Sequence, residues 1–135
     1  MKFMLMMHAP RGNGAYEISH WKPAEFQAHI QFMKDLNQEL RQAGEHLGAE
    51  GLAPPGQARI VRSKGDGAPE VTDGPFAESK EFLVGYWIVD VDSAERAYAI
   101  AGKASTAPGP GGTPLGIAIE VRQVMSGPPD LPWAT

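Results

Sequence analysis

Apolar residues recur along the chain at two spacings, which separate strands from helices. Near-continuous apolar runs over residues 2–8 and 83–89 predict two central strands, the second of them buried on both faces. The turn at residues 65–67 predicts that residues 69–72 return as a hairpin arm or an extended segment. Three shorter strands are predicted over residues 45–53, 57–64 and 117–125.

Helical spacing appears twice. Residues 23–43 carry apolar side chains three or four positions apart, which predicts one apolar stripe on a long helix: Phe26, Ile30, Met33, Leu36, Leu40 and Ala43. Pro23 suits the first helical position, and Gly44 ends the helix. A second helix is predicted over residues 94–102, with Ser93 as its N-cap. Small residues form its apolar face: Ala94, Ala97, Tyr98 and Ala101.

The order of elements is therefore β-α-β-β-arm-β-α-β. This order predicts an α+β fold, a ferredoxin-like antiparallel sheet with two helices on one face. The other face has no helical cover, so apolar residues there favour a homodimer. Residues 1–125 form the predicted domain, with a long loop at 105–116, and residues 126–135 form a Pro-rich tail whose Trp133 is expected to pack.

Composition narrows the classes of function. The 135 residues suit one domain, and 42% hydrophobic residues suit a globular core. A net charge of −4 without a basic tract argues against direct nucleic acid binding. The absence of cysteine suits a reducing cytoplasm, and the opening apolar run is too short for a signal peptide or a membrane span. We expect a cytoplasmic protein that does not enter the membrane.

The sharpest turn signal in the chain is Asp73-Gly74-Pro75, which Phe76 follows as an apolar anchor. Glu78, Lys80 and Glu81 place three charges directly after this turn. Carboxylates held close together can perform acid–base chemistry when their surroundings separate their pKa values. In the structural alternative, Asp73 caps the turn and Lys80 neutralises the glutamates.

Two histidines are candidates for a general base. His8 ends the first strand on the same side as Met4 and Met6, and His29 lies on the apolar stripe of the long helix. If that side of the strand faces the helix, both histidines border one cavity and the turn brings Asp73 to its rim. The alternative is that each histidine is satisfied by its own neighbours.

Other polar groups give weaker signals. Glu120 and Arg122 lie on one face of the last strand and are expected to form an exposed or interface ion pair. Tyr86 is a core residue or a surface for a ligand. The sequence contains no HxH, HxxxH or HExxH motif, so no metal is expected, and no Gly-rich loop has the context of a phosphate site.

Several segments together resemble one family. These are VTDGPFAESKE at residues 71–81, Gly85-Tyr86, DVDS at 90–93, IEVR at 119–122 and the opening MKFML. They resemble the YCII-related proteins of the DGPF type. The resemblance implies a dimeric ferredoxin-like α+β barrel, mostly bacterial and without a settled activity. It also implies relatives similar to dehydrochlorinases and muconolactone isomerases, with a suspected His–Asp pair, and a functional link to sigma factors.

Three functions stay open from the sequence. The first is a small-molecule lyase or isomerase without a cofactor, in which His8, His29 and Asp73 transfer protons and Glu78, Lys80 and Tyr86 bind the substrate. The second is a non-catalytic dimeric module that binds a small molecule or serves a sigma-factor system. The third is a purely structural interaction domain. A cavity in which a histidine meets a carboxylate would favour the first.

Overall fold

Four antiparallel strands form the main sheet of the computed structural model, which describes residues 1–11, 18–76 and 79–127. They lie in the order β2-β5-β1-β6, so the two long apolar runs are the central strands, as predicted. Their bounds are Lys2–Pro10 for β1, His46–Gly51 for β2, Glu81–Asp90 for β5 and Ile119–Gln123 for β6. With two helices between these strands in sequence, this is the predicted ferredoxin-like α+β fold.

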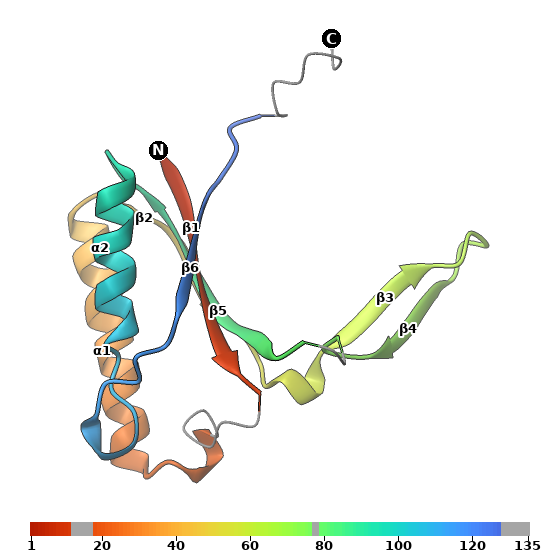
Figure 1. The fold of residues 1–135 in the computed structure, drawn as a ribbon, viewed down its shortest axis with the longest axis horizontal. Helices are drawn as coiled ribbons and strands as arrows, with labels where there is room; N and C mark the ends of the chain where they lie inside the picture. Colours follow the sequence, from red (N-terminus) through yellow and green to blue (C-terminus); the bar gives the residue numbers. More distant parts are fainter. Residues whose placement is uncertain (12–17, 77–78, 128–135) are drawn as a thin grey trace.

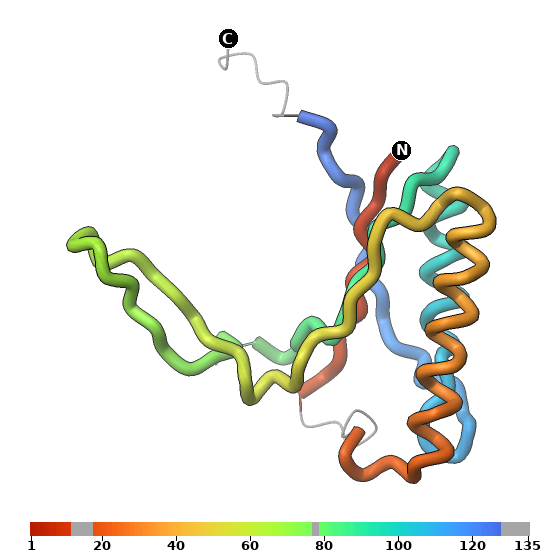
Figure 2. Tube along the Cα trace, turned by 180° about the vertical axis from the view of Figure 1, so that it is seen from behind, coloured from red at the N-terminus to blue at the C-terminus, as the bar shows by residue number. Residues whose placement is uncertain are grey.

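Both long helices cover the same face of the main sheet (Figure 1). Figure 2 shows the helices on this one side of the sheet from behind. Helix α1 spans Pro23–Gln42, and Gly44 after it takes a φ of 71°, a left-handed conformation that favours glycine and ends the helix. Helix α2 spans Ala94–Ser105, and its Ser93 hydroxyl accepts the Arg96 N–H at 3.2 Å, which confirms the predicted N-cap.

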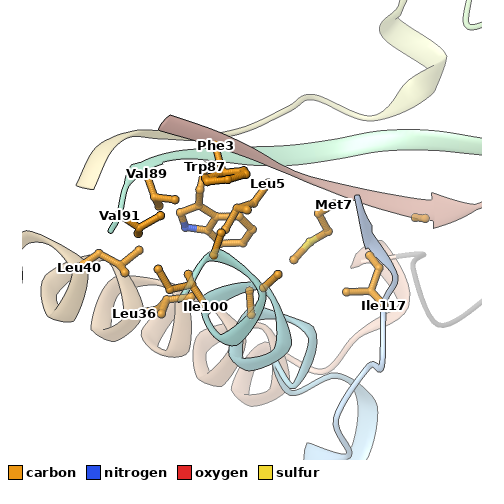
Figure 3. Packing of buried hydrophobic residues seen from close by; sticks show 14 residues of the cluster. Phe3, Leu5, Met7, Leu36, Leu40, Trp87, Val89, Val91, Ile100 and Ile117 are labelled. Carbon is orange, nitrogen blue, oxygen red and sulfur yellow. The ribbon is translucent and has the colours of Figure 1, made fainter. Parts of the chain in front are cut away.

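The core lies between this face and the helices (Figure 3). Alternate residues of β1 point into it, and Trp87 and Val89 of β5 lie beside them, opposite Leu36 and Leu40 of α1. The Trp87 indole N–H donates to the Asn37 side-chain oxygen at 2.9 Å, which satisfies the polar atom of a buried ring.

No helix of the described residues covers the opposite face of the sheet, and we call it the open face. Met4, Met6 and Ile88 lie on it and are half-buried, because they alternate with the buried positions of β1 and β5. The prediction that the second run is buried on both faces is therefore wrong. An apolar open face gives the same continuous apolar run as a strand covered on both sides.

A two-stranded hairpin, which we call the arm, leaves the main sheet on the side away from the helices (Figure 1). It pairs β3, Arg59–Ser63, with β4, Pro69–Asp73, and forms a sheet of its own. The cross-strand pair Val61 and Val71 is exposed. Of the two alternatives predicted for residues 69–72, the hairpin arm is therefore the one that forms.

Several predicted boundaries move. Helix α2 ends at Ser105, three residues beyond the predicted end. Tyr98 was expected on the apolar face of this helix, but its side chain is exposed, and Ile100 is buried there instead. Short 3-10 turns cover Ile18–His20, Pro55–Gln57 and Pro110–Gly112, the last within the predicted loop. The predicted packing of Trp133 concerns a residue outside the described part of the chain. In that described part, no helix is long and apolar enough to cross a membrane.

Candidate functional site

A cavity of about 910 Å³ lies where the arm leaves the main sheet, and we call it the arm cavity. Its walls come from the β2–β3 connection, the turn after β4, the start of β5 and the segment leading into β6. Apolar residues dominate the lining, including Pro54, Pro55, Pro75, Phe82 and Leu83. The described lining holds no Lys or Arg but has two acidic residues, Glu81 and Glu120, so it disfavours anions, and its apolar walls suit a molecule with an apolar body.

His8 and Glu120 meet at this cavity. The register of β1 shifts between Met7 and His8, and β6 places Glu120 opposite Met6 on the same face of the sheet. The His8 Nε2 and the Glu120 Oε1 are 3.1 Å apart, and the side chains are 25% and 50% exposed. An ionised carboxylate only accepts hydrogen bonds, so Nε2 carries the proton of this contact. The other ring nitrogen of the neutral imidazole is then a proton acceptor.

The rim of the arm cavity is held by Arg11. Its guanidinium donates to the backbone carbonyls of Phe76 at 3.3 Å and Ser79 at 3.2 Å, and its backbone N–H donates to the Lys80 carbonyl at 2.9 Å. On the other side of the turn, the Gly74 N–H donates to the Ala58 carbonyl at 2.9 Å. The DGPF turn is therefore tied to the end of β1 and to the start of the arm, with the Phe76 ring exposed beside the cavity.

A second cavity, of about 740 Å³, lies between α1 and the sheet, and we call it the helix cavity. It exists because only the C-terminal half of the α1 stripe, at Leu36 and Leu40, is buried. Phe26 and Ile30 in the N-terminal half are partly exposed and line the cavity instead. The two cavities share a wall, the segment 52–55 that follows β2.

His29 lines the helix cavity. Its Nδ1 lies 3.0 Å from the Pro108 carbonyl oxygen, and its ring packs edge-on against Trp21 with 5.4 Å between the centroids. A carbonyl only accepts, so Nδ1 carries the proton and Nε2 of the neutral ring is an acceptor. Gly111, on the loop that also carries Pro108, donates its N–H to the Glu25 carboxylate. This hydrogen bond and one from the Lys22 N–H hold the pKa of the Glu25 carboxyl below its ordinary value.

The structure does not bring the three predicted catalytic residues together. His8 lies on the open face with Met4 and Met6, and His29 lies on the helix side, so the sheet separates the histidines. Asp73 lines neither cavity, and its side chain is 96% exposed beside Arg59, with 3.6 Å between Oδ1 and the guanidinium Nε. Alternation groups residues on a face but does not say which face the helices cover.

The predicted substrate-binding residues also separate. Tyr86 lines the helix cavity, and Lys80 is exposed and lines neither cavity. Glu78 lies outside the described residues. Glu120 is the candidate site residue that the sequence reasoning missed, because the sequence analysis paired it with Arg122 on its own strand. Its alternation with Ile119 and Val121 separated it from the apolar side of β6, and the pairing of Glu120 with Met6 places it on the open face, where His8 lies.

No described group of three or more His, Asp or Glu side chains has a geometry that could hold a metal ion.

The chain matches the model of a known protein family. The family model of the YCII-related domain matches residues 1–111 of the chain. No curated protein matches. The matched range contains β1 through α2 and includes His8, His29 and the DGPF turn, whereas Glu120 lies beyond it.

Proposed function

Since the chain belongs to the YCII-related family, we propose that it is a small-molecule enzyme of the lyase or isomerase kind that transfers protons at the arm cavity. The observation that carries the proposal is the contact of His8 Nε2 with Glu120 Oε1 at 3.1 Å in the lining of a cavity of about 910 Å³. A histidine oriented by a carboxylate is the usual arrangement of a general base. Glu120 takes the part that the sequence assigned to Asp73.

The proposed chemistry follows from the roles of the two nitrogens. Glu120 holds the His8 Nε2–H, and the free nitrogen removes a proton from a carbon acid. The carboxylate then stabilises the imidazolium that forms, and the same nitrogen returns the proton to another atom or remains protonated while a leaving group departs. The absence of Lys and Arg from the described lining favours neutral substrates, such as ketones, lactones and esters with an acidic C–H.

Deuterium incorporation tests this proposal without knowledge of the product. A panel of neutral ketones, lactones and esters is incubated with the protein in D₂O, and loss of the acidic C–H signal is followed by proton NMR. We expect His8→Gln to slow exchange about 10²–10⁴-fold, the contribution of a general base, and Glu120→Gln to slow it by a smaller factor.

Two controls accompany these variants. Glu95→Gln makes the same substitution at an exposed position of α2, and His29→Gln alters the histidine on the other side of the sheet. Both should exchange at the wild-type rate. Exchange that survives in His8→Gln would rule out His8 as the base.

The second function is a non-catalytic module that binds a small molecule, with the sigma-factor link that the DGPF type implies. The half-exposed Glu120 favours it, since a solvated carboxylate orients a base less firmly than a buried one. This function replaces the first if compounds of the panel bind in a His8-dependent way and none of them exchanges.

We further propose that a second copy of the chain covers the open face. The supporting observation is the row of apolar residues there, Met4, Met6 and Ile88, with no helix above it. A stable dimer would bury more than ~1,000 Å² in total. Light scattering should give the dimer mass for the wild type and the monomer mass for Met6→Lys.

A further inference from the structure

We propose that the helix cavity is a second binding site, which takes a neutral, mainly apolar small molecule carrying one hydroxyl group. The hydroxyl donates a hydrogen bond to Nε2 of His29. This site lies on the other side of the sheet from His8 and does not depend on the proposed proton transfer.

The apolar body of the ligand follows from the lining. Met7 and Trp87 from the sheet meet Phe26, Ile30 and Met33 from α1 around a volume of about 740 Å³. Cavities of roughly 300–1,000 Å³ with such linings are typical of small-molecule sites. Phe26 and Ile30 are partly exposed in the chain alone, so a ligand between them and the sheet removes apolar surface from water.

Charge selects against ionised ligands. The described lining contains no Lys or Arg to pair with an anion, and Glu50 is the one acidic residue among those described. A carboxylate or phosphate would lose its hydration without gaining a partner cation. A cation would face one glutamate and an otherwise apolar wall, which leaves neutral molecules as the favoured class.

The hydroxyl follows from the state of His29. The Pro108 carbonyl at 3.0 Å fixes the proton on Nδ1, so the neutral ring offers Nε2 as an acceptor. The edge-on contact with Trp21 and the Glu25 bond to the same loop hold this orientation. A ligand that donates at this point satisfies Nε2, whereas a ligand without a donor leaves it unpaired.

The test compares two ligands with the same ring system by isothermal titration calorimetry at neutral pH. 2-Naphthol carries the hydroxyl, and 2-methoxynaphthalene has the same rings with the donor blocked. We expect wild-type protein to bind 2-naphthol about tenfold more tightly, the contribution of one hydrogen bond. His29→Phe should bind the two compounds with equal affinity.

A filling variant tests the location. Ile30→Trp places a larger side chain at the mouth of the cavity and should weaken both ligands at least about tenfold. Leu47→Trp is the matched control, because Leu47 is exposed and lines neither cavity. His8→Gln should bind 2-naphthol as the wild type does, so this site and the proposed catalysis fail or succeed separately. Equal wild-type affinities for the two compounds, no saturable binding, or an Ile30→Trp variant that binds normally would overturn the proposal.

Discussion

The ion pair between Glu45 and Arg96 should contribute about 1 kcal/mol to folding at neutral pH and lose that contribution in acid. The Arg96 Nε and Nη2 donate to the two Glu45 oxygens, each at 2.8 Å, so the pair is bidentate. It joins the residue before β2 to the first turn of α2. The Glu45 side chain is 15% exposed, so solvent screens its charge only partly. Because Arg96 is half-exposed, we expect a coupling free energy near the upper end of the range for surface ion pairs and not above it.

The pH dependence has a definite sign. The hydrogen bonds from Arg96 hold the pKa of Glu45 below its ordinary value of 4.5. A carboxyl whose pKa is lower in the folded state stabilises the protein above the unfolded pKa. This stabilisation is lost as the pH falls through the folded pKa. The effect should therefore be constant from pH 7 to about 5 and decline below 4.5.

A double-mutant cycle measures the coupling free energy between Glu45 and Arg96. Urea unfolding of the wild type, Glu45→Gln, Arg96→Met and the double variant gives the coupling free energy, expected at about 1 kcal/mol at pH 7 and near zero in acid. The more exposed pair between Lys103 of α2 and Glu39 of α1 is the control, with a coupling below about 0.5 kcal/mol. A Glu45–Arg96 coupling that does not change with pH, or is no larger than the control, would refute the reasoning.

Two further predictions concern stability. Leu40→Ala should lower the free energy of unfolding by about 2–5 kcal/mol, because Leu40 is fully buried against the sheet. Leu47→Ala, at an exposed site, should lower it far less, and equal losses in urea unfolding would contradict the assignment of Leu40 to the core. Asp73→Ala should change the free energy of unfolding by less than about 0.5 kcal/mol, since the carboxylate is almost fully exposed and its contact with Arg59 is long. A loss above about 1 kcal/mol would instead support the capping role that the sequence suggested for Asp73.

The sequence predicted the fold well because the signals that set it are local. The spacing from Phe26 to Leu40 marked α1, Ser93 marked the start of α2, and the two apolar runs marked the central strands. The same reasoning predicted burial on both faces of β5, since nothing in a strand's own residues tells whether a helix lies above it.

The candidate site was predicted less well because it is made by long-range pairing. His8 and Glu120 are 112 positions apart and meet only because β6 pairs with β1 in one register. The helix cavity depends on how far the N-terminal half of α1 stands from the sheet, and periodicity at Phe26 and Ile30 does not encode that distance.

The arm has a consequence for amide hydrogen exchange. Strands β3 and β4 pair only with each other in the described chain, and two-stranded hairpins are marginally stable on their own. Their amides can exchange when the arm alone opens, whereas β1 and β5 have neighbours on both sides and exchange mainly through global unfolding. The turn at Asp73 is the boundary between these two units. Slow exchange of the Ile60 and Thr72 amides, which pair within the arm, would therefore show that something else, such as a second chain, holds the arm closed.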